Sequence, residues 1–425
     1  MTAHSVEGVF AVSQKIALTR TTFLAYIVPP VVCLYFMGVL VQLKGTHFYR
    51  LAFLPVIVWL AWRGTFVDMS GGDPKQAQMN TMLIVSDPSP VSHGCMPFTV
   101  VYPKTHMCSF AMRGTGWAIT REPFRRQSPS NKHSKLDSES VYTAFWNAWD
   151  LMFSTRGIGW NWPRGLVVPK PAFETDSRVT FVLLSAARLA IHVLGFDACL
   201  QTICMLSPET FGSLNGGSLF DHTLPPLLEL LRSVFVSLLT VWMAYFVMQW
   251  SYQFLAIVCI ILFQQHPSQW PPLFDSPWLS TSLSELWGRR WHQMMRELLV
   301  TFGIRPFNYL FGRLGGLFGA FLVSGIFHDI ELRSFGRGGN SVAIIGFWVM
   351  NGFGVILERI WTKSTGRRVG GVWGWTWTFG WLALWGVWVV DEWAKAGRFG
   401  VLSLPGELKP SLVLAALVRR CLVGS

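Results

Sequence analysis

The sequence is poor in charged side chains. Only 14% of its 425 residues are Asp, Glu, Lys or Arg, whereas hydrophobic residues make up 51%. An ordinary globular domain carries about a quarter charged residues, and a soluble chain this apolar would expose large hydrophobic patches and aggregate. The shortage of charge therefore excludes a string of soluble domains and predicts an integral membrane protein.

The sequence also lacks the motifs that mark several common sites. Its seven cysteines form no Cys-x-x-Cys pair and no zinc-ligand spacing, and four of them lie in apolar runs, which predicts buried free thiols. There is no Walker loop and no G-x-G-x-x-G, G-x-S-x-G or H-E-x-x-H motif. We therefore expect no bound metal and no permanently bound cofactor.

Positive charge, in contrast, is in excess. The formal net charge is +12, and most Lys and Arg residues lie between the apolar runs. That placement is typical of loops that meet anionic lipid head groups. A basic surface also attracts a polyanionic cosubstrate. We expect a lipid bilayer as a partner and no nucleic acid.

Long apolar runs predict transmembrane helices, because a bilayer-spanning helix needs about 20 mostly apolar residues. The first run, Thr22–Leu43, contains Pro29 and Pro30, which predict a kink or a helix start. The other expected spans are 48–67, 179–205, 227–250, 252–263, 314–330, 341–360 and 373–390, with a short or interfacial piece at 411–422. Residues 227–263 form either one long helix or two helices with a break. We predict an all-α, polytopic membrane protein with about seven to nine spans.

These runs divide the chain into three regions. Residues 1–67 hold the N-terminal transmembrane helices, and residues 179–425 form a membrane-embedded core. Between them, residues 68–178 are expected to form an extramembrane loop, because the stretch up to Lys135 is rich in Pro, Ser, Asp and Lys and has no sustained period. Within this loop, Val141–Phe153 is amphipathic and too short to span, which predicts an interfacial helix.

A first candidate site lies at Ser282–Glu297, with the sequence SLSELWGRRWHQMMRE. As one helix, this segment would present a polar face opposite a tryptophan-rich one. The polar face would carry Glu285, Arg289, His292 and Arg296, with Arg290 beside it and Trp291 on the other face. A helix on the lipid surface whose arginines meet phosphates would have the same pattern.

A second candidate is His328. Gly316, Ala320, Ser324 and His328 recur at every fourth residue, so a stripe of small residues leads to the imidazole. An ionisable side chain inside a membrane helix is a functional-site hypothesis by default. The neighbouring Asp329 would orient the ring or pair with an arginine. The alternative is a histidine that only hydrogen-bonds to a neighbouring helix.

Another histidine pattern carries less weight. His192 and Asp197 have the H-x4-D spacing of the glycerophosphate-type acyltransferases. The pair lies within an expected membrane span, and no Glu-Gly-Thr-Arg element follows it. We interpret the spacing as a coincidence.

The two candidate sites together resemble a known family. SELWGRRWHQMMRE resembles the F-W-x-R-R-W-H type motif of the wax synthase branch of the membrane-bound O-acyltransferases. SGIFHD resembles the S-G-x-x-H-[DE] segment that holds that superfamily's active-site histidine, and His328 follows His292 by 36 residues. Leu286 departs from the aromatic residue usual in the family. The resemblance covers about 270–358 and is strongest to the fungal enzymes that acetylate terpenoid and meroterpenoid hydroxyl groups.

The resemblance implies an acyl-CoA:alcohol O-acyltransferase of the endoplasmic reticulum, with acetyl-CoA as cosubstrate and a hydrophobic terpenoid alcohol as acceptor. It assigns His328 as general base and His292 as a donor to the oxyanion or a group that positions the acyl donor. The coenzyme A phosphates would meet the arginines, and three residues would support the site. The arginines are Arg289, Arg290 and Arg296, and the supporting residues are Trp291, Ser324 and Asp329.

Two alternatives stay open at this point. A long-chain enzyme that makes wax or sterol esters would carry the same motifs. A transporter or lipid-binding membrane protein would use Arg and His to line a path, although the sequence has no inverted repeat typical of transporters. The oligomeric state and the acceptor alcohol have no sequence signature.

Overall fold

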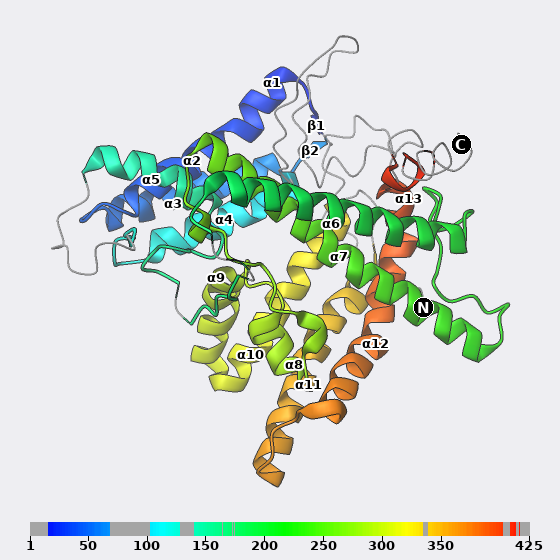
Figure 1. Ribbon diagram of the computed structural model, residues 1–425. Coiled ribbons are helices and arrows are strands. Elements are labelled where there is room, and N and C mark those ends of the chain that lie inside the picture. The colour runs from blue at the N-terminus through cyan, green and yellow to red at the C-terminus, as the bar shows by residue number, and fades with distance from the viewer. Residues whose placement is uncertain are drawn as a thin grey trace, which may run out of the picture. The chain divides into compact units, whose positions relative to one another are not determined.

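The computed structural model is built almost entirely of helices (Figure 1). It describes residues 16–68, 103–127, 140–163, 165–171, 173, 175–334, 339–402, 409–413 and 416. Within these residues the strands are β1 (Ile16–Ala17) and β2 (Val67–Asp68), which pair in parallel over two residues each. The all-α prediction is confirmed.

The chain forms two compact units. The first comprises Met1–Arg126, Ser130–Phe153 and Ser334–Gly336, and the second comprises Gln127–Pro129, Ser154–Arg333 and Arg337–Ser425. Both candidate sites lie in the second unit. We describe each unit by itself.

The first unit begins with a helix that changes character at its prolines. α1 (Arg20–Thr22) and the π-helical turn η1 (Phe23–Ile27) lead into α2 (Val28–Leu40), with a proline in the first turn. The backbone is helical through all three elements, and Arg20–Leu40 is one helical stretch of 21 residues. The proline pair therefore follows a π-helical turn inside a helix, an arrangement typical of a kink, and the alternative prediction of a helix start was wrong.

Three more helices complete this unit. α3 (His47–Gly64) packs against α4 (Pro103–Ile119), and α2 packs against α5 (Val141–Phe153). α5 has the bounds expected of the interfacial helix. α4 lies in the stretch that we expected to form an extramembrane loop, and its 17 residues are helical although the sequence there shows no sustained period. Arg113 of α4 donates to the carbonyls of Leu151 and Met152 at the end of α5, a tertiary contact that periodicity does not reveal.

The second unit opens with two long helices that lie side by side (Figure 1). They are α6 (Arg178–Leu206) and α7 (Pro226–Leu262), which has 37 residues and no interruption. Of the two possibilities for residues 227–263, the structure has the single long helix. Gly195 allows α6 to approach α7, because a Cβ at that position would lie 2.7 Å from the Phe246 ring.

The helix that carries His328 folds back on itself. α10 (Arg305–Ser334) is interrupted at Gly312, whose φ of 67° lies in the left-handed region. A Cβ placed on Gly303 would lie 2.5 Å from the carbonyl oxygen of Gly319, although 16 residues of continuous helix would separate the two by about 24 Å. Residues before and after Gly312 therefore form a helical hairpin. Its second arm begins where the sequence predicted a span from Leu314.

Two further helices pack against this hairpin. α11 (Ser341–Thr365) and α12 (Gly371–Lys395) are joined by a short loop and contact each other, and α13 (Arg398–Leu402) follows α12. Gly325 of α10 brings that helix against α11, since a Cβ there would lie 3.0 Å from the Ile345 Cα. An apolar cluster that includes Leu283, Phe321 and Val355 fills the space between the elements.

Five stretches of the described chain are long and apolar enough to cross a membrane. They are Arg20–Leu40, Arg178–Leu206, Pro226–Leu262, Arg296–Ser334 and Ser341–Thr365. Two expected spans form the helices α3 and α12 but are not among the five; α3 carries Arg50 and Arg63, and α12 is rich in tryptophan, which is an interfacial residue. The count is lower than the seven to nine expected, and most of the expected segment 411–422 lies outside the described residues. The membrane character is confirmed.

Candidate active site

The segment predicted to be one amphipathic helix is broken in the middle. α8 (Leu283–Glu285) and the π-helical turn η5 (Leu286–Arg290) end at Trp291, whose backbone is extended at φ −72° and ψ 160°. Helix resumes at α9 (Arg296–Leu298) and η6 (Leu299–Ile304). The prediction of a single helix was wrong, so the polar residues from Glu285 to Arg296 do not share one helical face.

A side chain after the break accounts for the end of this helix. The side-chain amide of Gln293 donates to the backbone carbonyls of Gly288 and Arg289 at 3.2 and 3.3 Å. Those carbonyls would otherwise be left without partners at a helix end. The return of Gln293 to the preceding turn requires residues 291–295 to leave the helical path, and this places His292 in an irregular segment.

The start of the same segment is held by α11. The buried carboxylate of Glu358 accepts the amides of Leu283 and Ser284 at 2.6 and 3.0 Å and the Ser284 hydroxyl at 2.7 Å. A carboxylate at a helix N-terminus satisfies amides that have no partner within the helix. Three residues further along, the Trp287 indole donates to Asn351 at 3.0 Å. One helix thus fixes the first candidate site at two points.

The arginines of this segment are paired with carboxylates. Arg290 lies 2.7 Å from Glu285, and Arg289, with a side chain 52% exposed, lies 2.9 Å from Asp275. Burial alone would raise the pKa of Glu285, but hydrogen bonds from Thr281 and Arg290 lower it below its usual value. Arg290 is therefore held within the fold, whereas Arg289 presents its guanidinium to the surface.

His328, in the second arm of the α10 hairpin, is held by Glu331 and Trp348. Its Nδ1 lies 3.2 Å from Glu331, one turn further along the helix, and the other oxygen of Glu331 accepts from Arg398 at 2.7 Å. Trp348 of α11 stacks on the imidazole, with centroids 4.5 Å apart and planes 6° from parallel. The ring is therefore fixed in both position and orientation.

Asp329 does not contact this ring. It accepts from Arg333 at 2.9 Å and from the Ser341 hydroxyl at 2.9 and 3.0 Å, which ties α10 to the start of α11. Of the two alternatives for Asp329, the structure has the pairing with an arginine. Ser324 lies one helical turn before His328 on the same arm.

His292 faces the same region from the irregular segment. Its pKa is lowered to about 3, first by burial and then by the positive charges of His328 and Arg156. The Nδ1 atom of His292 is buried and has no hydrogen-bond partner within the described part of the chain. This ring is a neutral imidazole with an unused polar atom.

Aromatic rings connect the two histidines. Trp291 packs against Phe274 with ring centroids 4.9 Å apart and against Trp287 at 6.1 Å. Trp287 in turn lies 5.2 Å from Trp348, which stacks on His328. Trp291 also lies 5.8 Å from the His292 ring, so a continuous series of ring contacts, here called the aromatic wall, runs from His292 to His328.

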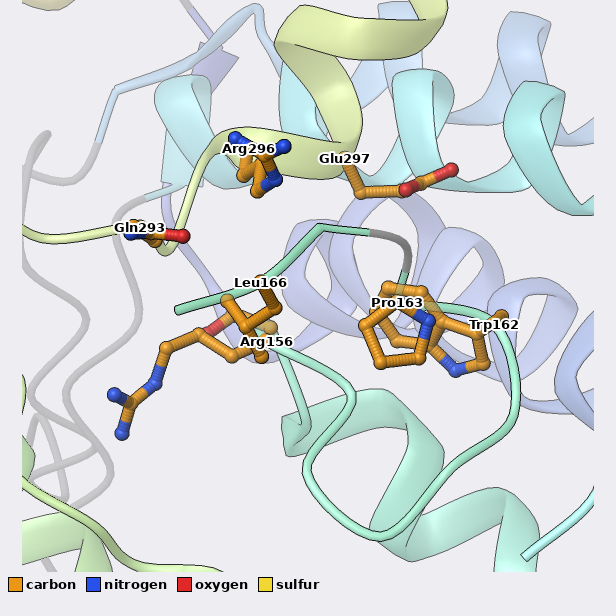
Figure 2. Close-up of a pocket in the computed structure, with 8 residues that line it drawn as sticks. Arg156, Trp162, Pro163, Leu166, Gln293, Arg296 and Glu297 are labelled. Atoms are coloured by element: carbon orange, nitrogen blue, oxygen red, sulfur yellow. The ribbon is translucent and has the colours of Figure 1, made fainter. Parts of the chain in front are cut away.

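Arg296 lines a small cavity beside this site (Figure 2). The cavity has a volume of about 10 Å³, which is room for one water molecule. Its lining consists of Thr155, Arg156, Trp162, Pro163, Leu166, Gln293, Arg296 and Glu297. Arg156 donates to the carbonyls of Pro271 and Pro272 at 2.7 Å. Arg156 thus holds the loop before α8 in place. The cavity is too small for an acyl donor.

Comparison with known proteins identifies this region. Residues 270–350 match the model of the membrane bound O-acyl transferase family. This segment of the chain is similar to that family. The matched segment contains His292, His328 and Trp348, and this part of the predicted resemblance is confirmed.

Individual relatives fall into two groups. Acetyltransferase aurG of Calcarisporium arbuscula is 29% identical over 41% of this chain and 44% of its own length. Acetyltransferase ple2 of Rhodocybe pseudopiperita is 25% identical over 63% and 70%. Acyl-CoA–sterol O-acyltransferase 1 of Arabidopsis thaliana is 35% identical over 23% and 30%. The chain thus matches less than half the length of the first and the third of these acyltransferases.

Several residues of the site were missed by sequence reasoning. Glu331, three residues after His328, has the spacing of a same-face helical pair and could have been found. Arg398, Asn351 and Glu358 lie far along the chain and carry no local motif. Among the described residues no group of His, Cys, Asp and Glu could hold a metal ion.

Proposed function

We propose that this protein is an acyl-CoA:alcohol O-acyltransferase that uses His328 as its general base. The observation that carries the proposal is that an oriented His328 and a half-buried, neutral His292 both lie inside the segment that matches the acyltransferase family. A positioned base is needed because an alcohol is a poor nucleophile near neutral pH, and histidine titrates closest to that pH.

The reaction follows from these groups. His328 takes the proton of the acceptor hydroxyl as its oxygen attacks the carbonyl carbon of the thioester. The tetrahedral intermediate then collapses, the carbon–sulfur bond breaks, and the thiolate of coenzyme A takes up the proton. The products are an ester and free coenzyme A, and His328 is returned to its starting state. The aromatic wall would exclude water, which would otherwise hydrolyse the donor.

His292 suits the stabilisation of the oxyanion. An oxyanion needs a hydrogen-bond donor that is already in place, and the Nδ1 atom of His292 is buried without a partner in the described residues. A neutral imidazole can donate from one nitrogen. Removal of one oxyanion donor costs about 10²–10³-fold in kcat, so we expect a loss of this size in His292→Ala.

The acyl donor is proposed to be acetyl-CoA, because the relatives aurG and ple2 are named acetyltransferases. The diphosphate of coenzyme A would bind basic side chains of the first candidate site, Ser282–Glu297. Arg289, which is exposed, is the first choice for that contact, and Arg296 and Arg290 are the others. We further propose a hydrophobic terpenoid alcohol as acceptor, residues 179–425 as the membrane-embedded core, and the endoplasmic reticulum as the site of action.

The test uses microsomes that contain the wild-type protein or His328→Ala. They are incubated with radiolabelled acetyl-CoA and a panel of terpenoid alcohols, with palmitoyl-CoA as competing donor. We expect labelled ester from the wild type and a decrease of about 10²–10⁴-fold in the variant. His222→Ala changes an exposed histidine of the same chain and serves as the matched control.

Each other outcome has a definite meaning. Ester formation by His328→Ala at the wild-type rate would remove His328 as base. A preference for palmitoyl-CoA would make the enzyme a long-chain wax or sterol acyltransferase, the class to which the Arabidopsis relative's name belongs. Movement of the alcohol across the membrane without any ester would favour a transporter.

A further inference from the structure

The base of the proposed reaction is linked to a half-buried ion pair. One carboxylate oxygen of Glu331 lies 3.2 Å from the Nδ1 atom of His328, and the other accepts a hydrogen bond from Arg398 at 2.7 Å. Arg398 comes from α13, 67 residues further along the chain, and its guanidinium also lies 4.5 Å from the ring of Trp393. Three residues from two elements thus form one chain of charge-assisted contacts.

We propose that Glu331, oriented by Arg398, is the positioning residue that fixes His328 in the tautomer required of a base. An ionised carboxylate only accepts hydrogen bonds. The contact between Glu331 and Nδ1 therefore requires the proton to be on Nδ1, which leaves Nε2 with the free lone pair. This inference rests on the proposed function for its role in catalysis, but the tautomer is a property of the ring itself.

Arg398 keeps the carboxylate ionised. Burial without a partner would favour the protonated acid, and a neighbouring cation reverses that preference. The side chains of Arg398 and Glu331 are only 18% and 19% exposed, so water screens the pair little. A protonated Glu331 would be able to donate to Nδ1 and would favour the opposite tautomer. The arginine thus determines which nitrogen of His328 is basic.

The same carboxylate assists the step that follows proton removal. When His328 takes the proton of the alcohol, a positive imidazolium forms beside Glu331, and the negative charge stabilises it. Among the described residues, Asp329 and His292 do not offer this contact. Asp329 is occupied by Arg333 and Ser341, and His292 is neutral.

The tautomer is measurable without turnover. We would label histidine with ¹⁵N, reconstitute the full chain in lipid, and assign His328 by comparison with His328→Ala. Solid-state spectra of the wild type should show a protonated Nδ1 at His328 near neutral pH. Glu331→Gln should lose that single state. Glu229→Gln, which alters a second His–Glu contact of 3.0 Å at His222, should leave the His328 signals unchanged.

The kinetic arm measures kcat and KM as functions of pH. We expect Glu331→Gln to reduce kcat by about 10²-fold or more, by comparison with the loss of the carboxylate from a catalytic triad, with KM for acetyl-CoA changed little. Glu331→Asp should recover part of kcat, and Arg398→Lys should retain more activity than Arg398→Met.

The outcomes separate this inference from the proposed function. A wild-type His328 protonated on Nε2, or a tautomer unchanged in Glu331→Gln, would overturn the inference even if the enzyme is fully active. A protonated Nδ1 that depends on Glu331 would support it even if no donor or acceptor in the panel reacts. Absence of ester from the wild type counts against the proposed function alone.

Discussion

The imidazole of His328 lies flat against the indole of Trp348, with ring centroids 4.5 Å apart and planes 6° from parallel. The contact joins α10 to α11, because His328 belongs to α10 and Trp348 belongs to α11. An aromatic face attracts a cation more strongly than a neutral ring. Trp348 is therefore expected to favour the imidazolium that forms when His328 accepts a proton.

Replacement of Trp348 by Leu should weaken catalysis moderately. An aromatic pair contributes about 0.5–1.5 kcal/mol beyond its buried area, which corresponds to roughly a 2- to 13-fold decrease in kcat. Trp348→Phe should retain most of the wild-type kcat. The measurement is ester formation as a function of pH, with the highly exposed Trp373→Leu as control.

His292 should make the protein less stable as the pH falls. Its pKa in the folded state is lowered to about 3, whereas an unperturbed histidine titrates at about 6.5. Below about pH 6.5 the unfolded chain therefore binds a proton that the folded chain does not. As the pH falls, the free energy of unfolding decreases by at most about 1.4 kcal/mol per pH unit. This contribution is complete only when the pH falls below the folded pKa.

The check compares thermal unfolding in detergent at pH 7 and pH 5. The wild type should lose more stability over this interval than His292→Gln, which cannot take up a proton. His266→Gln, at an exposed position, should behave as the wild type. Parallel losses in the wild type and His292→Gln would contradict a buried neutral imidazole.

Glu358 should be required for the fold of the first candidate site, Ser282–Glu297. Its carboxylate accepts two amides and a hydroxyl at the start of α8 and the Trp377 indole at 3.0 Å. Glu358→Ala would leave these buried donors without a partner, at a cost of about 1–3 kcal/mol each at most. We expect a lower unfolding temperature together with loss of activity. Glu331→Gln, in contrast, should lose activity at nearly unchanged unfolding temperature.

A matched control for this test is Glu209→Ala, which removes an exposed carboxylate from a turn after α6. It should leave the unfolding temperature unchanged. If Glu358→Ala unfolds at the wild-type temperature, the four hydrogen bonds do not hold the motif in place.

The parts of the fold that the sequence predicted are those in which local pattern and burial agree. Val141–Phe153 is amphipathic and forms α5 with those bounds, and the apolar run from Ser341 forms α11. The two histidine motifs were also found, because each combines an unusual polar residue with a recognisable neighbourhood. Their order in the family could be read from a few residues.

The parts that were missed depend on long-range contacts. Ser282–Glu297 has helical periodicity, but Gln293 binds the carbonyls of the preceding turn and ends the helix before His292. No local signal shows that Glu358 holds its start from 75 residues away. Arg398 likewise reaches Glu331 only because α12 returns the chain to α10. Tertiary contacts of this kind decide the site and leave no pattern in the sequence.

The α10 hairpin offers a final test of how His328 is positioned. Its two arms meet where Gly303 and Gly319 face each other, and a Cβ on Gly319 would lie 2.5 Å from the Gly303 carbonyl oxygen. Because the obstacle is backbone, Gly319→Ala must separate the arms, and overpacking of this kind costs typically about 1–3 kcal/mol. We expect a lower unfolding temperature and a larger proportional loss of kcat, since His328 lies on the displaced arm. Gly346→Ala in α11, where a Cβ would meet nothing within 4 Å, should be neutral in both measurements. A Gly319→Ala variant with the stability and kcat of the wild type would show that the arms do not approach so closely, and a continuous helix through Gly312 would then be the better description.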